Sequence, residues 1–226
     1  MAPVTIVSYD GTSSDDDALE FARVFGEAGS ELVLAYVRHS TRVDAGRERL
    51  EESEAKALLD RGAAALDGVE TRCQVVVHAS TSEGLKELAK SSGAGLVVFG
   101  SEYRTPAGRV SPQHSTQALL DDGPTAIAIA PSGYRARNVN TIGLLAQLDD
   151  HAAIDTAHAL ARHFQAQVTD ATHDVDLLIV GSRPEAPEGR TMISAHAQNV
   201  IEGATAPVLV VARGVALSFR QPLHVG

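Results

Sequence analysis

The 226-residue chain contains no tryptophan, and aromatic residues make up only 4% of it. A core must therefore be built mainly from alanine, valine, leucine and isoleucine, and a hydrophobic content of 44% is ordinary for a globular protein. The single cysteine, Cys73, excludes an intrachain disulfide. Because Cys73 lies within the segment RCQVVV, which is expected to form a strand, we expect it to be a small core or edge residue of that strand.

Positive charge is also scarce. The sequence has 19 lysines and arginines against 29 aspartates and glutamates, a formal net charge of −10. Nucleic acids and anionic membrane surfaces attract basic proteins, so we expect neither as a partner. The N-terminus lacks the basic segment of a signal peptide, and no run approaches the ~18 apolar residues of a membrane span. We therefore expect a cytoplasmic protein.

Eight short apolar runs divide the sequence, and most of them contain β-branched residues. Continuous apolar runs of this length are typical of strands that are buried on both faces of a parallel sheet. We predict strands at Val4–Val7, Leu32–Val37, Val75–Val77, Leu96–Phe99, Ala126–Ala130, Ile142–Leu145, Leu177–Val180 and Val208–Val211.

Helical patterns separate the first five runs. The expected N-cap of the first helix is Ser13, Ser14 or Asp15, and the long second helix is expected to bury Leu50, Ala57, Leu58 and Ala65. Strands that alternate with helices in this way predict an α/β fold with an open, doubly wound parallel sheet. The helices are predicted at Asp15–Ala28, Arg47–Leu66 and Ser82–Lys90, with a fourth that contains Gln117–Asp121.

The last part of this unit occurs twice. The segment that begins at Leu96 aligns without a gap with the segment that begins at Leu177. The helix residues Ala18 and Ala153 also correspond. The stretch from Ala153 to Leu177 is much shorter than the stretch from Ala18 to Leu96, so the second copy has lost a middle segment. The missing part corresponds to the long helix, the Cys73 strand, the third helix and most of the second strand.

In a flavodoxin-like sheet the strand order is 3-2-1-4-5, so deletion of strands 2 and 3 leaves a contiguous 1-4-5 ribbon. We predict a complete domain over residues 1–132, a truncated second domain over 139–214, and a tail over 215–226 for which the sequence offers no interpretation. A half-domain of about 75 residues buries little apolar surface. We therefore expect it to pack on the first domain as a pseudo-dimer.

Several segments resemble the universal stress protein family in its tandem form, over nearly the whole chain to about Gly214. They are VTIVSYDGTSSDDDALEFA, ELVLAYV, LVVFGSEYRTPAGRVSPQHSTQALLDDGPTAIAIAP and, in the second half, DLLIVGSRPEAPEGR followed by ATAPVLVVARG. The resemblance implies a fold of the flavodoxin or HUP-like kind. It also implies that the last strands of two domains, here Ala126–Ala130 and Val208–Val211, pair antiparallel. This pairing would make a homodimer or a pseudo-dimer within one chain.

The nucleotide-binding branch of that family carries the loop G-x2-G-x9-G-[ST], whose amides cradle phosphates at the start of a helix. Gly100 matches the first glycine, and Asp10 matches an aspartate that meets the adenosine end of the ligand. The remaining loop positions hold Tyr103, Gln113 and His114, and so depart from the pattern. The resemblance implies a candidate cofactor-binding set of Asp10, Val37, Gly100, Ser101, His114, Ser115 and Thr116.

The second copy departs further from the loop pattern. Its corresponding positions hold Gly181, Pro184, Ser194 and Ala195, and proline has no N–H to donate. The loop resembles those of family members that bind no ATP. We therefore predict a stress-response protein that acts by binding to an unknown protein partner rather than by catalysis, with no cofactor expected. An ATP-binding stress protein that uses the first domain, with or without slow hydrolysis, remains an alternative.

Other residue patterns leave further alternatives open. Thr12–Asp17 resembles the loop of pyrophosphate-releasing ATP enzymes but lacks its paired glycines, and is more simply an N-cap followed by acidic residues. His39 and His78 follow neighbouring predicted strands and form either a metal or ligand site or two exposed strand ends. Arg109 and Arg190 recur at equivalent places. They either capture an anion or, as we prefer, bond backbone carbonyls or a carboxylate across the pseudo-twofold axis.

Overall fold

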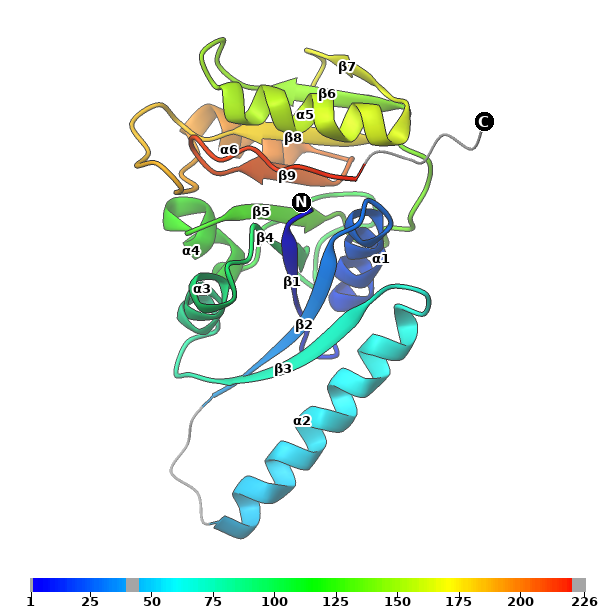
Figure 1. Ribbon diagram of the computed structural model, residues 1–226, viewed down its shortest axis with the longest axis vertical. Helices are drawn as coiled ribbons and strands as arrows, with labels where there is room; N and C mark the ends of the chain where they lie inside the picture. Colours follow the sequence, from blue (N-terminus) through cyan, green and yellow to red (C-terminus); the bar gives the residue numbers. More distant parts are fainter. Residues whose placement is uncertain (1, 40–44, 221–226) are drawn as a thin grey trace.

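The computed structural model describes residues 2–39 and 45–220. Its strands form one nine-stranded sheet that runs through the whole molecule, with helices on both faces (Figure 1). The strands are β1 (Val4–Ser8), β2 (Glu31–Arg38), β3 (Thr71–Val77), β4 (Leu96–Gly100), β5 (Ala126–Ala130), β6 (Thr141–Leu145), β7 (Gln167–Thr169), β8 (Leu177–Gly181) and β9 (Val208–Val211). The helices are α1 (Ser13–Glu27), α2 (Ala45–Ala65), α3 (Thr81–Ser92), α4 (His114–Asp122), α5 (His151–Phe164) and α6 (Ala195–Gly203).

The strand order across the sheet is β3-β2-β1-β4-β5-β9-β8-β6-β7. The first five strands have the predicted order 3-2-1-4-5, and every neighbouring pair within them is parallel. Strands β6, β8 and β9 lie side by side in the predicted order 1-4-5 and are also parallel. The fold class predicted from the sequence is therefore confirmed. We refer to the part up to β5 as the first half and to the part from β6 as the second half.

The two halves meet where β5 pairs with β9, and this is the only antiparallel pairing between neighbouring strands of the described sheet. The antiparallel pairing is the one expected from the family resemblance, and its register places Ala128 opposite Leu209. Every residue of both strands is buried, so the seam lies inside the core. One apolar cluster covers each face of the sheet, and both clusters contain residues of β5 and of β9.

Arg109 and Arg190 both cross this seam. Arg109 Nη1 donates to the carbonyl oxygen of Gly203 at 3.0 Å, and Arg190 Nε donates to Asp122 Oδ1 at 2.7 Å. The structural role preferred from the sequence is therefore confirmed for both arginines. Each arginine thus bonds the last residue of a helix in the other half, Arg109 at the end of α6 and Arg190 at the end of α4.

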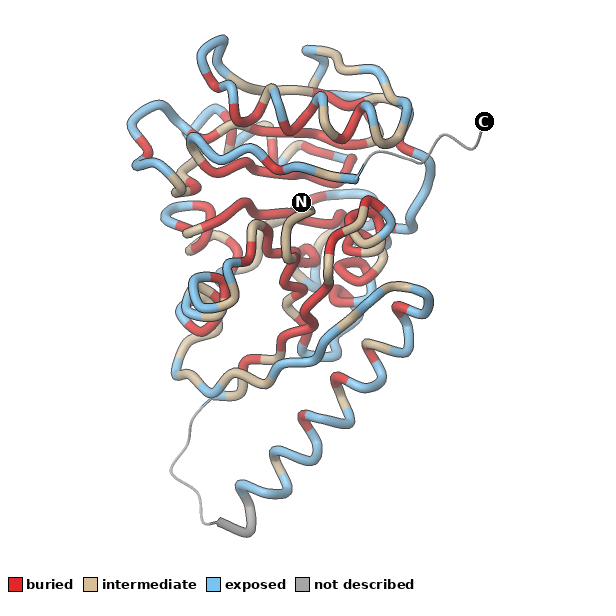
Figure 2. Tube along the Cα trace, viewed as in Figure 1, coloured by how far each residue is buried: buried red, intermediate tan, exposed pale blue. Residues whose placement is uncertain are grey.

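Two details of the helices differ from the prediction. Helix α1 begins at Ser13 with Thr12 as its N-cap, so the cap is one residue earlier than any of the three candidates. Helix α2 buries Ala55 and Leu59, whereas Leu50 is 60% exposed. The predicted inward face was wrong for Leu50, Ala57 and Ala65, which are exposed, because alanines and leucines occur on several sides of this helix. Leu58 is half-buried against the core, as predicted. Figure 2 shows that α2 is buried along one side only, since it covers the outermost strands of the sheet.

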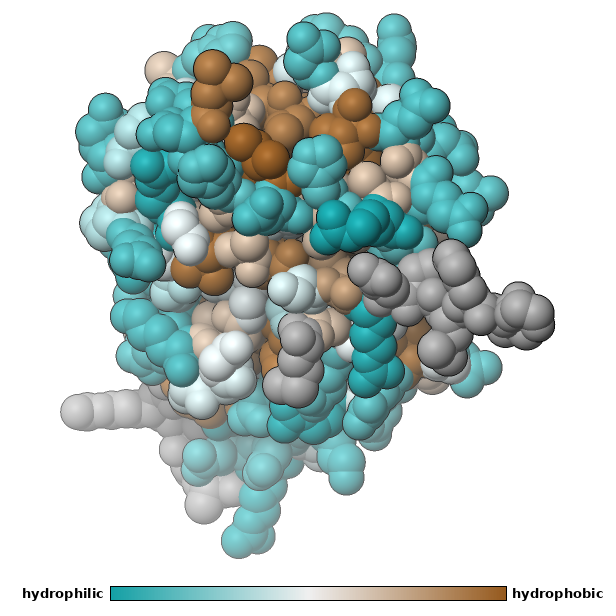
Figure 3. Space-filling model, turned by 45° about the horizontal axis from the view of Figure 1, so that its top comes forward, coloured by the Kyte–Doolittle hydropathy of each residue, from teal (hydrophilic) through white to brown (hydrophobic). Residues whose placement is uncertain are grey.

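The sequence did not predict β7, which pairs with the first three residues of β6. This strand has three residues, of which only Val168 is large and apolar, so no apolar run marks it. Beyond the pairing, Leu144 and Leu145 are half-buried, and Leu148 in the next loop is 97% exposed. Apolar side chains are gathered over this part of the second half in Figure 3. The second half is thus least covered at its outer edge, next to β6 and β7. At the corresponding edge of the first half, the sheet extends beyond β1 by the two longer strands β2 and β3.

Residues 215–220 run from the second half to the first. The amide of Leu217 donates to Thr156 Oγ1 of α5 at 2.9 Å, and the Leu217 side chain is 4% exposed. Farther along, the ring of Phe219 stacks on Phe25 of α1, and the amide of Arg220 donates to the Ala28 carbonyl. The described part of the predicted tail is therefore a strap across the two halves; residues 221–226 lie outside the described residues. None of the described helices is long and apolar enough to span a bilayer.

Candidate functional site

A cavity of about 310 Å³ lies at the carboxyl edge of the first half, where β1, β2 and β4 end and α4 begins. Ligands of doubly wound sheets bind at this edge. Four of the seven candidate residues line the cavity: Asp10, Val37, Gly100 and Ser115. The structure therefore brings together residues from four separate segments of the chain.

The other three candidates do not line this cavity. Ser101 is fully buried, and its hydroxyl donates to the Ala130 carbonyl at 2.7 Å and accepts from the Ser111 amide. Ser182 in the second half bonds the Val211 carbonyl in the same way. Thr116 is fully buried in α4, and His114 is the exposed first residue of that helix. The repeated serines join the ends of neighbouring strands, which is a structural role.

Gly100 is required by packing. A Cβ atom at this position would lie 2.6 Å from the carbonyl carbon of Ser14, and still closer to the Ser14 oxygen, both in the backbone of α1. Real Cβ atoms do not approach backbone atoms so closely. Gly181 is similar, because a Cβ atom there would meet the Asp150 carboxylate. Close approach of α1 therefore explains Gly100 without a phosphate, whereas at Gly181 the crowding atom belongs to the side chain of Asp150, the N-cap of α5.

The loop between β1 and α1 has its own carboxylate bound to its amides. Asp15 Oδ2 accepts from the backbone N–H groups of Asp10, Gly11 and Thr12, at 2.6, 2.8 and 3.1 Å. Gly11 adopts a positive φ of 83°, a conformation that favours glycine. Asp15 is 5% exposed. The anion-binding turn at the end of β1 is thus already occupied by a side chain.

The loop after β4 is bonded internally as well. Gln113 Nε2 donates to the carbonyls of Gly100 and Ser101, each at 3.3 Å. Glu102 Oε2 accepts from the Arg104 amide at 2.9 Å. Tyr103 is 66% exposed, and the Arg104 guanidinium lies 5.0 Å from the centre of its ring. The N-cap of α4, Gln113, makes no side-chain cap bond to the first turn of that helix.

Burial raises the pKa of Asp15 to about 7, helped by the neighbouring Asp10 carboxylate. The unfolded chain releases this proton near pH 4 and the folded chain near pH 7. Between these values the folded state holds the extra proton, so the free energy of unfolding falls as pH rises. The pKa values of buried Asp17 and Asp150 are raised in the same direction.

We therefore expect the chain to be more resistant to urea at pH 5 than at pH 8. The shift of Asp15 corresponds to roughly 3 kcal/mol at most over this window. Urea unfolding of the wild type and of Asp15→Asn at both pH values measures how much of the pH dependence Asp15 contributes, because the asparagine does not titrate. An equal pH dependence in the two proteins would show that Asp15 does not titrate in this range.

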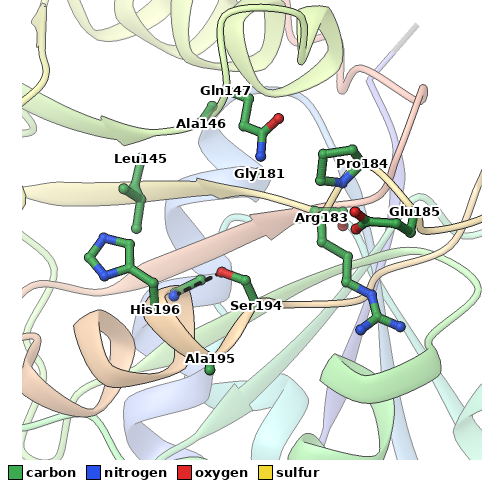
Figure 4. Close-up of a pocket in the computed structure, with 12 residues that line it drawn as sticks. Leu145, Ala146, Gln147, Gly181, Arg183, Pro184, Glu185, Ser194, Ala195 and His196 are labelled. Carbon is green, nitrogen blue, oxygen red and sulfur yellow. Dashed lines mark hydrogen bonds between the residues drawn. The ribbon is translucent and has the colours of Figure 1, made fainter.

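The second half contains a cavity of about 490 Å³ at the corresponding edge (Figure 4). Its lining includes the four residues that match the loop pattern there, Gly181, Pro184, Ser194 and Ala195. Ser194 Oγ is already used as the cap of α6, since it accepts from the Ala197 amide at 3.1 Å. Among the described residues that line this second cavity, none corresponds to Tyr36 or Thr81 of the first cavity.

Sequence reasoning missed the contribution of Asp15, Tyr36 and Thr81 to the first cavity. Asp15 was expected only at the helix start, and no motif marks the other two.

His39 also lines the cavity, where its Nδ1 lies 3.2 Å from the Ala79 carbonyl, whereas His78 is bonded to Ser80. Among residues 2–39 and 45–220, no group of three or more His, Cys, Asp or Glu side chains is arranged to hold a metal ion.

Comparisons with known proteins agree with this fold. A universal stress protein from Archaeoglobus fulgidus superposes with a TM-score of 0.72 at 11% identity, over 93% of this chain and 98% of that one. A protein of unknown function from Pseudomonas aeruginosa superposes with a TM-score of 0.65 at 13% identity, over 94% and 93%. At these identities the likeness shows the fold alone.

A search of curated proteins by sequence finds no match. The model of the universal stress protein family matches residues 3–128, which include β1 to β4 and most of β5. This match covers more than half of the sequence and contains the first cavity. The chain therefore belongs to the universal stress protein family.

Proposed function

We propose that this universal stress protein acts in a cytoplasmic stress response by binding, without catalysis, and that its first cavity does not hold a nucleoside triphosphate. The observation that carries this proposal is the bond of Asp15 Oδ2 to the amides of residues 10–12. A carboxylate placed there repels phosphate and uses the donors that phosphate needs. The bonds of Gln113 and Glu102 within the second loop support the same view.

We further propose that the second half is a truncated copy of the first, so that the β5–β9 pairing replaces an interface between two chains. The equivalent bonds of Ser101 and Ser182 to the ends of β5 and β9 support a duplication. So do the crowded glycines Gly100 and Gly181 at the ends of β4 and β8.

Binding of an adenine nucleotide in the first cavity is the second candidate function. It is favoured by the uncapped first turn of α4, whose amides and helix dipole attract an anion, and by Asp10 at the end of β1. A pyrophosphatase-type enzyme gains no support from Thr12–Asp17. Asp15 and Asp17 are both buried and bonded to backbone amides, Asp17 Oδ2 to Gly133 at 2.8 Å.

Calorimetric titration with ATP and Mg²⁺ separates these candidates. We expect no saturable heat up to millimolar ATP for the wild type. The matched control is the triple variant Tyr103→Gly, Gln113→Gly, His114→Ser, which restores the family loop. Binding by this variant alone would attribute the exclusion of ATP to the loop, whereas no binding by either would attribute it to Asp15. A wild-type Kd below about 1 mM would overturn the proposal.

A further inference from the structure

Strand β7 corresponds to the beginning of β2. Its residues pair in register with residues 141–143 of β6, just as residues 31–33 of β2 pair with residues 4–6 of β1. In the first half β2 continues from there over residues 34–38 and covers the end of β1. In the second half β7 ends at Thr169, so the line of this strand stops early.

The end of β6 therefore lies at an open edge, at the outer side of the second half (Figure 1). Leu144 lies beside Ile179 of β8 as Val7 lies beside Val98 of β4, so Leu144 corresponds to Val7. Val7 is fully buried, because β2 pairs with it. Leu144 and Leu145 are only half-buried, since no strand of the described residues pairs with them on the outer side.

The backbone at this edge is also without a partner. In the first half the amide of Tyr9 donates to the Ala35 carbonyl of β2 at 2.9 Å, and the residue that corresponds to Tyr9 is Ala146. The Asn140 carbonyl faces the same side as Ala146 and accepts from the Gln167 amide of β7. Within residues 2–39 and 45–220, no hydrogen bond is made by the Ala146 amide. Such edge groups pair readily with an added strand.

The side chains at the edge set the chemistry of that strand. Leu144 packs on the apolar cluster that contains Leu34 of β2, and Leu145 packs on the opposite cluster, which contains Ala35. A segment that continues the line of β7 would place successive side chains against these two clusters in turn. It therefore needs aliphatic residues at adjacent positions, as β2 has at Leu34 and Ala35.

Charges near the edge favour a basic segment. Asp170 directly follows β7 and is exposed, and Asp174 in the same loop is exposed as well. None of the ion pairs between described residues includes either carboxylate. The whole chain carries a formal net charge of −10. Lysine or arginine at the ends of the segment would complement these charges and speed its association.

A second copy of this chain is a poor occupant. Its described sheet ends in β3 at one side and in β6 and β7 at the other. Pairing of β3 with the open edge of another copy is a head-to-tail contact, which builds filaments rather than a closed dimer. Two symmetric edges would meet only around residues 144–146, because β7 of each copy fills the rest of the row. That contact is far smaller than the ~800 Å² per partner of a stable interface.

We infer that the open edge of β6 binds an extended segment of another protein, in which adjacent aliphatic residues are flanked by lysine or arginine. The segment adds to the sheet as a parallel strand in line with β7, where residues 34–38 of β2 lie in the first half. This inference rests on the proposed action by binding, and it adds the surface and the kind of partner.

The test is a titration of the isotope-labelled protein with the peptide acetyl-KLAYVRK-amide, followed by two-dimensional NMR. The peptide has the sequence of residues 34–38 between added lysines. We expect saturable shifts of the amide signals of Leu145, Ala146 and Gln147, with a Kd below about 1 mM. Ala146→Pro removes the donor from the protein and should weaken binding about tenfold or more. Proline is tolerated at sheet edges, and the thermal midpoint of the variant checks its folding.

Two N-methylated peptides form a matched pair that leaves the protein unchanged. In β2 the backbone of Ala35 faces β1, whereas alternate residues face β3, as the bond from the Leu32 amide to the Glu70 carbonyl shows. N-methylation of the peptide alanine therefore blocks a bond to β6 and should weaken binding about tenfold or more. N-methylation of the peptide leucine alters only the outward side and should leave the Kd within about threefold.

Absence of saturable binding, shifts confined to other parts of the chain, or equal Kd values for the two N-methylated peptides would each overturn the inference. Sedimentation of the protein alone gives a further check. Self-association that Ala146→Pro abolishes would assign the edge to a second copy and overturn the inference as well. The two proposals fail separately: heat with ATP overturns the proposed function of the first cavity, and a peptide that does not bind overturns only the docking of a segment at β6.

Discussion

Gly100→Ala is expected to destabilise the first half by about 3 kcal/mol or more, or to prevent its folding. The added Cβ atom would overlap the backbone carbonyl of Ser14, so α1 would have to move away from β4. Helix α1 contributes Leu19, Phe21 and Phe25 to the apolar cluster on that face of the sheet, and a shift of the helix would disturb all three. Urea unfolding followed by far-UV circular dichroism measures the loss.

Gly203→Ala is the matched control. Gly203 is the last residue of α6, and a Cβ atom there would meet nothing within 4 Å. Alanine favours the helix over glycine by up to about 1 kcal/mol, so this variant should be as stable as the wild type or slightly more so. If Gly100→Ala were equally stable and lost only ligand binding, the glycine would serve the ligand and the packing argument would be wrong.

Leu217→Asp is expected to cost about 3–5 kcal/mol, because it places an unpaired charge in a buried site. Leu217 packs beside Gly95 of the first half, while its amide is bonded to Thr156 of the second half. The substitution should therefore detach the strap from both. We expect the urea midpoint to fall and the rings of Phe219 and Phe25 to separate, which near-UV circular dichroism follows.

Val215→Asp serves as the comparison for this prediction. Val215 belongs to the same segment but is 44% exposed, so a carboxylate there stays in water. Its cost should remain within about 0.5 kcal/mol, as for surface substitutions in general. Similar losses for the two variants would mean that the negative charge, and not the buried contact, destabilises the chain.

The strand order was predictable because continuous apolar runs leave few arrangements other than a parallel sheet covered by helices. The repeat predicted that β5 and β9 are equivalent strands, and the resemblance to the universal stress protein family implied that these two strands pair antiparallel. The short strand β7 and the strap at Leu217 were not predictable in this way. Their residues contribute through contacts with distant segments and leave no periodic pattern in the sequence.

The candidate site was predictable only in part. Asp10 and Gly100 lie at the ends of predicted strands and could be placed at the carboxyl edge of the sheet, and both line the first cavity there. The role of Asp15 depends on the direction of its side chain, which turns back to the amides of the preceding loop. The side-chain torsion angles decide whether such a carboxylate caps the helix or bonds the amides of the preceding turn. Residue type and spacing do not predict these angles.

The position of β9 in the sheet has a consequence during synthesis on the ribosome. Strand β5 ends at Ala130, and its antiparallel partner begins only at Val208, after the rest of the second half has been made. At roughly 5–20 residues per second this interval lasts about 4–16 s. Throughout it, the nascent first half presents the unpaired edge of Ala-Ile-Ala-Ile-Ala to other chains, and exposed apolar edges of this kind template aggregation. We therefore expect nascent chains stalled between these two strands to associate with one another, and completed chains to lose that tendency.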